Sequence, residues 1–422
     1  MSPPVRMRPP SAPPGRGRFL WAAGIEDTFI ARPHPATGRI LDEYALTEHY
    51  DRWEEDLALL AELGVSAARV GIPWHRVNPS PGVFDWEWTD RVLDRLVNTH
   101  GIEPIVDLVH YGTPLWMERA FLDPDYPARV EEYAHAYAQR YRDLCRWHTP
   151  LNEPRVCAWY AGRLGWWPPY GRSWRAFAEV LLALCRGICL TQRAIAAVQP
   201  QALFVHVDAS DLYVPADLQD AALVERARLL QEIVFLPLDL VTGRVDDSHP
   251  LAGWLRGRGV SDEHLAWLRG HAVQPGILGF NMYPMFSRKE VRRAPRGGFR
   301  TRIRPCWTET LVEIARLYAA RHPAAPLMIT ETGCNGSARR RARWIEDSRR
   351  AVEQLRAESV ELVGYVYWPL FSLVGWAYQR GRHALDRYMV HMGLWDLRSS
   401  PNGLQRVRTP AVDAFQRAMR SL

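Results

Sequence analysis

The sequence predicts a single (β/α)8 barrel, or TIM barrel, with extended loops after its strands. Eight short apolar runs of β type alternate with amphipathic helical patterns along the 422 residues, as parallel strands and crossover helices do. The hydrophobic content of 47% provides material for a large core. No GxGxxG or Walker loop follows any of these runs, which weakens the competing prediction of a doubly wound open sheet.

The predicted elements follow one another in regular order. The strands span Phe19–Gly24, Ala67–Gly71, Pro104–Val109, Arg146–Leu151, Leu203–Val207, Ile277–Asn281, Leu327–Ile329 and Val363–Trp368. Between them, apolar residues recur with the 3.6-residue period of helices, most clearly over residues 50–64, 85–101, 127–144, 174–199 and 341–357. The first two helical stretches end at Gly64 and Gly101, which suit the left-handed conformation that closes a helix.

The chain divides into a tail of residues 1–18 and one catalytic barrel of residues 19–422. The tail is rich in Pro and Arg and lacks an apolar segment, so we expect it to be disordered and not a signal peptide. Residues 209–275 exceed the length of one βα unit, and we expect Asp211–Pro250 to form extended loops and extra helices. In a barrel, long insertions usually follow strands on the C-terminal face, where sites are built.

Composition narrows the classes of function. The net charge of +6, from 53 basic and 47 acidic residues, is mild and dispersed, which disfavours a nucleic-acid partner. No uninterrupted run of 18 apolar residues predicts a membrane span. The six cysteines form no CxxC pair, which is typical of a reducing compartment, so we expect a cytoplasmic protein. The nearest candidate for a metal site, His110 with His206 and Asp208, lacks recognisable ligand spacing, so we expect neither a metal nor another cofactor. The sequence leaves open whether the protein forms a homo-oligomer.

Polar and aromatic side chains stand at the carboxyl ends of the predicted strands, where barrel enzymes carry their active sites. Two carboxylates stand out, Glu153 after the fourth strand and Glu331 after the seventh. Glycoside hydrolysis needs such a pair, because one carboxylic acid protonates the leaving oxygen while the other carboxylate attacks the anomeric carbon or activates water. Hydrogen-bond donors would keep one carboxylate ionised, and an apolar setting would keep the other protonated. The remaining strand-end residues are Arg69, His110, Tyr111, Asn152, His206, Asp208, Asn281, Tyr283 and Trp368.

Each of these residues also has a purely structural interpretation. A glutamate at a strand end is more often a surface charge or a neighbour of a helix N-cap. His110 could be a satisfied core histidine, Arg69 could pair with a barrel carboxylate, and Asn281 and Tyr283 could be turn residues. Their joint placement on one face, with complementary chemistry, favours an active site.

The chain resembles glycoside hydrolase family 1, the β-glucosidase-like retaining enzymes, from "FLWAAGIED" at Phe19 to "HMGLWDL" at residues 391–397. "LNEP" matches the acid/base motif of that family, and "ITETG" resembles its nucleophile motif. The resemblance implies that Glu153 is the general acid/base and Glu331 the nucleophile. It also implies substrate contacts or orienting roles for His110, Asn152, Arg69, Tyr283, Trp368 and Trp376, with the 2-hydroxyl of the sugar held by Asn152.

Four departures from the family pattern affect the sugar-binding residues. The family's Gln in the loop after strand 1 is replaced by Glu26 or Asp27, and its His-Trp after strand 3 becomes His110-Tyr111. Its Glu-Asn-Gly becomes Glu331-Thr332-Gly333. After strand 8, the Glu that grips the outer sugar hydroxyls is missing, since Val374-Gly375 precede Trp376.

We therefore expect a retaining glycosidase that acts on a modified or deoxy sugar, or on a small glycoside with an apolar aglycone. A glutamate carboxylate that accepts hydrogen bonds from sugar hydroxyls contributes roughly 1.5–3 kcal/mol per charge-assisted hydrogen bond. The loss of this glutamate should therefore weaken the binding of glucose or galactose. Two alternatives stay open. The barrel could serve glycosyl transfer or acid/base elimination or hydration in specialised metabolism, or it could bind sugars without catalysis.

Overall fold

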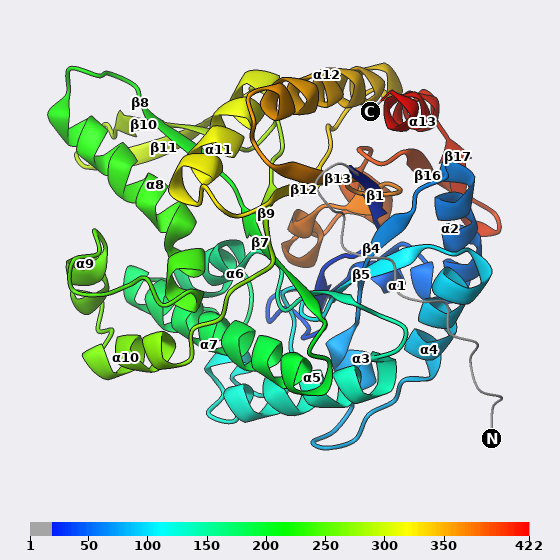
Figure 1. Cartoon of the computed structure of the whole chain (residues 1–422), viewed down its shortest axis with the longest axis horizontal. Helices are drawn as coiled ribbons and strands as arrows, with labels where there is room; N and C mark the ends of the chain where they lie inside the picture. Colours follow the sequence, from blue (N-terminus) through cyan, green and yellow to red (C-terminus); the bar gives the residue numbers. More distant parts are fainter. Residues whose placement is uncertain (1–18, 422) are drawn as a thin grey trace.

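The computed structural model describes residues 19–421, so the tail that we expect to be disordered lies outside the described residues. Eight parallel strands close into a barrel in the order β1-β13-β12-β9-β7-β6-β5-β4 (Figure 1). Each of the eight predicted runs overlaps one of these strands. They are β1 Leu20–Gly24, β4 Ala67–Gly71, β5 Glu103–Asp107, β6 Trp147–Thr149, β7 Leu203–Ala209, β9 Ile277–Asn281, β12 Leu327–Thr332 and β13 Leu362–Tyr367.

Closure of the barrel excludes an open sheet, because β13 pairs with β1 in parallel and leaves no edge. The structure confirms the predicted fold class. Three predicted strands were too long at their carboxyl ends: β5 stops at Asp107, β6 at Thr149 and β13 at Tyr367. Two were too short, since β7 continues to Ala209 and β12 to Thr332.

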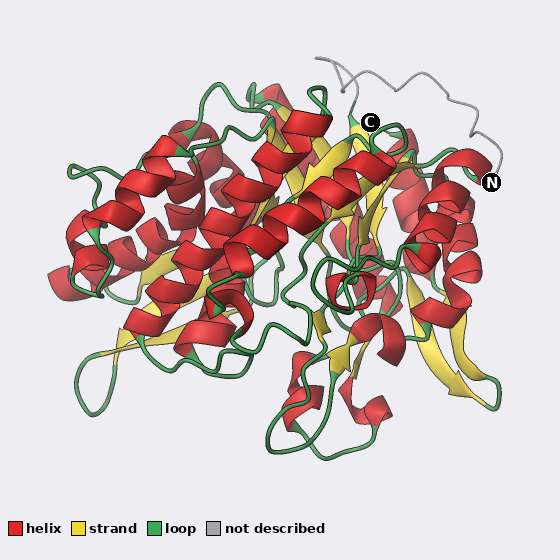
Figure 2. Ribbon diagram, turned by 90° about the horizontal axis from the view of Figure 1, so that it is seen from below, coloured by secondary structure: helices red, strands yellow, loops and turns green. Residues whose placement is uncertain are grey.

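Helices surround the strands (Figure 2). Those of eight residues or more are α2 His49–Leu63, α4 Glu87–Asp94, α5 Tyr126–Tyr141, α7 Trp174–Val198, α8 Ala221–Val241, α10 Asp262–Gly270, α11 Thr308–Arg321, α12 Ala338–Ala357 and α13 Pro410–Arg420. Gly64 closes α2 with φ 82°, as its position predicts. Shorter helices are α1 Glu43–Leu46, α3 Trp74–Val77, α6 Pro154–Ala158 and α9 Ala252–Arg256, and single turns are η1 Arg95–Thr99, η2 Ala120–Leu122, η3 Trp159–Arg163, η4 Trp376–Arg380 and η5 Leu385–Tyr388.

The segment Asp211–Pro250 differs in part from the prediction. It contains the long helix α8, but it opens with a strand, β8 Leu212–Pro215, where we expected a loop. This strand pairs with β10 Arg288–Arg293, which pairs in turn with β11 Phe299–Arg304, so a small sheet lies beside α8 (Figure 1). The other short strand pairs are β2 Phe29–Ile30 with β3 Leu41–Asp42, β14 Leu373–Val374 with β15 Met389–Val390, and β16 Trp395–Ser400 with β17 Gly403–Arg408.

One helix in the described part of the chain, α7, is long and apolar enough to cross a membrane by length and composition alone. The sequence search missed it because Arg186 interrupts the apolar run. Within its most apolar window, 67% of the residues are buried, and the helix packs against α5 and α8. Such burial is that of a core helix in a globular protein.

The alternation of side chains along the strands positions the polar residues. One apolar layer fills the barrel interior and includes Ala67, Ile105, Ile277 and Val366. Because successive side chains of a strand point to opposite faces, the residue two positions further on faces the interior again. These next positions are Arg69 on β4, Asp107 on β5, Gly279 on β9 and Trp368 after β13. Asn281 lies two residues beyond Gly279 on β9, at the following inward-facing position. The polar layer therefore lies directly above the apolar one.

Candidate active site

Arg69 lies at the centre of the polar layer and is fully buried. Its Nη1 donates to Glu26 Oε1 at 2.9 Å and to Glu331 Oε1 at 2.5 Å, and its Nη2 donates to Asp107 Oδ2 at 2.8 Å and to Asn152 Oδ1 at 2.7 Å. Burial disfavours a charged guanidinium, but the surrounding carboxylates outweigh it and raise the pKa of Arg69. The cation thus ties four strand ends of the barrel together.

Glu331 accepts side-chain hydrogen bonds on both of its carboxylate oxygens. Besides Arg69, the Tyr283 hydroxyl donates to Glu331 Oε2 at 2.7 Å. The register of β12 shifts next to Glu331 against both neighbouring strands, which is the signature of a β-bulge. Bulges near active sites redirect side chains, and this one brings Glu331 to Arg69 on the far side of the barrel. Hydrogen bonds to both oxygens thus fix the orientation of the carboxylate.

Glu153 lies in a different environment. Its Oε1 accepts from Asn281 Nδ2 at 2.9 Å, and its Oε2 accepts a short hydrogen bond from the Tyr111 hydroxyl. Burial, followed by the negative charge of Glu331, raises the pKa of Glu153 to about 8, although Tyr111 and Asn281 partly counteract this. Glu153 therefore carries a proton at neutral pH.

The local backbone directs Glu153 into the site. The residue caps α6 in a left-handed conformation, with φ 43° and ψ 62°, and Pro154 begins the helix. Its amide donates to Val207 O at 3.1 Å, which holds the turn against β7. Such a conformation is uncommon for a residue with a side chain and frequently marks a functional position.

His110, Asn152 and Tyr111 form one hydrogen-bonded chain. His110 Nδ1 lies 2.9 Å from Asp107 Oδ2, and its Nε2 lies 3.1 Å from Asn152 Nδ2. Asn152 Nδ2 also donates to the Tyr111 hydroxyl at 2.7 Å. Sequence reasoning missed Asp107. A charged residue inside the apolar run "PIVDLV" was the available signal.

Glu26, and not Asp27, is the residue that contacts Arg69 from the loop after β1. It is completely buried, and burial, offset in part by Arg69, raises its pKa well above the usual range. Asp27 instead lies beside Glu43, away from Arg69. The structure therefore places Glu26 beneath the site and leaves no exposed surface through which it could grip a sugar.

The two predicted tryptophans border the site. Trp368 Nε1 donates to Glu26 O at 2.9 Å, and its ring lies 5.9 Å from that of Tyr283. Trp376 Nε1 donates to Thr28 Oγ1 at 3.0 Å, and its ring contacts three aromatic residues, of which the sequence analysis identified only the first: Tyr111, Tyr160 and Trp167. Val374 and Gly375 stand before Trp376, where the resemblance expects a glutamate, and Val374 is buried and apolar.

His110, His206 and Asp208 do not form a joint metal set. His206 Nε2 pairs with Asp208 Oδ2 at 3.0 Å, whereas His110 pairs with Asp107. Within residues 19–421, no group of three or more His, Cys, Asp or Glu side chains is arranged to hold a metal ion.

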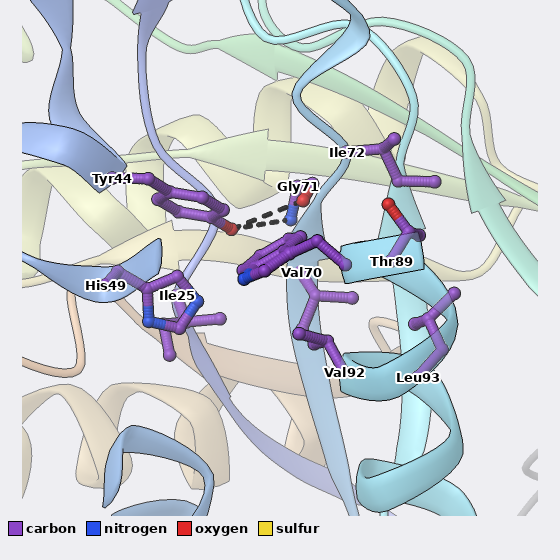
Figure 3. Close-up of a pocket in the computed structure, with 10 residues that line it drawn as sticks. Ile25, Tyr44, His49, Val70, Gly71, Ile72, Thr89, Val92 and Leu93 are labelled. Carbon is purple, nitrogen blue, oxygen red and sulfur yellow. Dashed lines mark hydrogen bonds between the residues drawn. The ribbon is translucent and has the colours of Figure 1, made fainter. Parts of the chain in front are cut away.

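The cavity of Figure 3 is separate from the two glutamates. It lies between β4, α2 and α4 and has a volume of about 10 Å³, which is room for one water molecule. The Tyr44 hydroxyl closes it by bonding both the amide and the carbonyl of Gly71. Glu153 and Glu331 themselves are only 6% and 4% exposed, so the reactive groups sit at the bottom of a nearly closed site.

Comparison with known proteins adds the family context. Residues 14–246 match the family model described as glycosyl hydrolase family 1, a span that includes Glu153 and ends before Glu331. A bifunctional β-D-glucosidase/β-D-fucosidase of Bifidobacterium breve is 29% identical over 86% of this chain and 86% of its own length. A thermostable β-glucosidase B of Thermobispora bispora is 27% identical over 91% of this chain and 83% of its own.

Solved structures show the same fold. The family 1 β-glucosidase of Thermotoga maritima superposes with a TM-score of 0.83 over 99% of this chain and 98% of its own, at 18% identity. Its complex with castanospermine gives the same TM-score over 99% of both chains. At this identity the likeness concerns the barrel and its extensions, and the side chains of the site have to be judged from their own geometry.

Proposed function

The chain belongs to glycosyl hydrolase family 1, a family of glycosidases, and we propose that it cleaves β-glycosides by a retaining double displacement with Glu331 and Glu153 as the catalytic pair. The observation that carries this proposal is the contrast between the two carboxylates. Glu331 accepts hydrogen bonds from Arg69 and Tyr283, while burial keeps Glu153 protonated, with a pKa of about 8. Pairs of acids with opposed environments divide the roles of nucleophile and acid.

The reaction then runs in two steps. In the first, Glu331 attacks the anomeric carbon, the bond to the leaving oxygen breaks, and Glu153 transfers its proton to that oxygen. In the second, the ionised Glu153 takes a proton from water, the water oxygen attacks the anomeric carbon, and the bond to Glu331 breaks. Arg69 and Tyr283 orient Glu331, and Asn281 orients Glu153.

We further propose that the sugar carries fewer hydroxyl groups than glucose. Val374 and Gly375 offer no side-chain hydrogen bond, and Glu26 is completely buried with its Oε1 bonded to Arg69, so two positions expected to bind sugar hydroxyls are apolar or closed to solvent. The Bifidobacterium relative is named for activity on fucosides as well as glucosides, and fucose lacks the 6-hydroxyl of galactose. This supports tolerance of deoxy sugars at such a site.

The mechanism is tested with the variants Glu331→Gln and Glu153→Gln and with an activated 2-deoxy-2-fluoro-β-glycoside. Each variant should lose turnover by about two orders of magnitude or more, because each removes a group that acts on the reacting atoms. Mass spectrometry of the wild type should show a covalent sugar on Glu331. Full activity in either variant would refute the assignment.

The same experiment separates the alternatives. Acid/base elimination or hydration would leave no sugar adduct on Glu331. A glycosyl transferase would form the adduct but pass the sugar to an added alcohol in preference to water. A sugar-binding barrel would bind glycosides in calorimetry without releasing an aglycone.

A further inference from the structure

The Tyr111 hydroxyl occupies the centre of the reaction site. It accepts from Asn152 Nδ2 at 2.7 Å and donates to Glu153 Oε2. Apart from burial, the charges of Glu153 and Glu331 are the main causes that raise the pKa of Tyr111, which places its oxygen near both carboxylates. A protein hydroxyl thus lies where substituents next to the anomeric carbon have to fit.

Asn152 has no amide hydrogen left to donate to a sugar. Its Oδ1 accepts from Arg69 Nη2, and its two amide hydrogens are directed to His110 Nε2 and to Tyr111. The nitrogens of His110 are likewise engaged by Asp107 and Asn152. The amide precedes Glu153 in the chain and shares Arg69 with Glu331, so it faces the atoms next to the anomeric carbon. Of the sugar hydroxyls, only the one on C2 is attached to a carbon bonded to the anomeric carbon.

Tyr111 has no adjacent space into which it could withdraw. Its ring packs 4.5 Å from the ring of His110, 5.1 Å from Trp167 and 5.6 Å from Trp376. The cavity that it lines on its other side measures about 20 Å³, enough for a water molecule but far less than a phenol ring needs. The hydroxyl therefore belongs to the site that receives the substrate.

We propose that Tyr111 replaces the 2-hydroxyl of the sugar in the hydrogen-bond pattern and makes the enzyme selective for 2-deoxy-β-glycosides. The proposal rests on the proposed function and specifies which hydroxyl the substrate lacks. A 2-deoxy sugar leaves the bonds from Asn152 to Tyr111 and from Tyr111 to Glu153 intact. A sugar with a 2-hydroxyl has to break at least one of them, and a buried polar group that loses its partner is costly.

The test compares 4-nitrophenyl β-glycosides with their 2-deoxy analogues in the gluco and galacto series. For each enzyme, the selectivity is kcat/KM for the 2-deoxy compound over kcat/KM for the parent, divided by the ratio of the two spontaneous hydrolysis rates. Selectivity above one is expected for the wild type. Tyr111→Phe frees one hydrogen of Asn152 for a 2-hydroxyl, so selectivity should fall by about 5- to 10-fold, the effect of one neutral hydrogen bond. The fall should arise mainly from a lower KM for the parent glycoside.

Tyr111→Trp, which restores the residue of the family pattern, should shift selectivity in the same direction. Tyr160→Phe removes a hydroxyl from the same aromatic cluster without touching Asn152 or Glu153, so it should keep the wild-type ratio. Melting temperatures near that of the wild type show that the variants are folded.

Two results would refute the proposal, and they differ in whether the glycosidase mechanism survives. If the fluorinated sugar labels Glu331 but Tyr111→Phe and the wild type share one selectivity, the role of Tyr111 is refuted and the glycosidase mechanism stands. If neither labelling nor turnover of any of these glycosides occurs, the proposed function fails, and the selectivity proposal fails with it.

Discussion

The charge of Glu331 acts through space on Glu153. The negative charge of Glu331 is, after burial, the second cause of the raised pKa of Glu153. Replacing Glu331 by Gln removes that charge and keeps the side-chain shape. We expect the pKa of Glu153 to fall from about 8 toward the usual range of a glutamate, because the ionised form no longer faces a like charge. Carbon NMR titration of labelled glutamate measures this directly, and an unchanged pKa would contradict the coupling.

Tyr111 has the opposite effect to Glu331 on the pKa of Glu153. Its hydrogen bond stabilises the ionised form of Glu153 and lowers the pKa of that residue. The activity of the wild type should decline as pH rises through about 8, because Glu153 then loses the proton that it donates. In Tyr111→Phe the decline should begin at higher pH. The measurement is kcat/KM for an aryl glycoside against pH, and a shift to lower pH in the variant would refute this interpretation.

The sequence identified the residues of the site better than it identified their contacts. Glu153 and Glu331 could be predicted because each follows a predicted barrel strand. The sequence could not choose between Glu26 and Asp27, since the choice depends on the direction of the loop after β1. Nor could it predict that the Tyr111 hydroxyl bonds to Asn152, because such a bond depends on the packing of three aromatic neighbours.

At the scale of the elements, the contact between β9 and β12 controls both glutamates. Thr330 on β12 donates to Asn281 Oδ1 at 2.7 Å, which leaves the amide hydrogens of Asn281 to face Glu153. Gly279 on β9 allows this close contact, because a Cβ at that position would lie 2.4 Å from Thr330 Cγ2 and 2.6 Å from His206 O. The hydrogen bond from Thr330 thus orients Asn281, and Asn281 in turn orients Glu153.

Gly279→Ala tests this contact. The added methyl group meets the backbone of β7 as well as Thr330, so the strands have to separate, at a cost of about 1–3 kcal/mol in the free energy of unfolding. The displaced Thr330 should also weaken the support of Glu153 and lower kcat. The control Gly253→Ala lies on α9, where a Cβ would meet nothing within 4 Å, and should not reduce stability. Equal melting temperatures and turnover for wild type and Gly279→Ala would show that the contact is not essential.

The three strands of the small sheet beside α8 were missed for a common reason. All eight barrel strands could be predicted, because buried parallel strands are continuous apolar runs bounded by helices. The strands β8, β10 and β11 are partly or fully exposed, and β10 and β11 consist largely of arginine and other polar residues. β8 pairs with the distant β10, and neither strand of the β10–β11 hairpin is a continuous apolar run, so no local pattern indicated these strands.

For the whole molecule, the barrel gathers buried acidic side chains near its carboxyl end. Burial raises the pKa of Glu26 and Asp27 well above the usual range, and it raises those of Glu43 and Glu153 to about 7 and about 8. Glu43 lies completely buried in α1, where Thr28 N donates to its Oε2 at 3.4 Å and to Asp27 Oδ1 at 2.9 Å. Two buried acids in one place favour a bound proton, since both cannot ionise without repulsion.

Because the fold raises these pKa values, the folded protein binds more protons than the unfolded chain above the usual pKa of a glutamate. The stability contributed by Glu43 is therefore fully present below about pH 4.5 and is lost as pH rises through about 7. We expect the free energy of unfolding of the wild type to fall relative to Glu43→Gln between about pH 4.5 and 7, by up to about 1.4 kcal/mol per pH unit, and to level off above pH 7. Urea unfolding at several pH values measures the difference. His148 and His322, whose pKa values are lowered to about 4, change the stability of both proteins equally and cancel in it. Parallel stability curves for the two proteins would mean that Glu43 holds no proton in the fold.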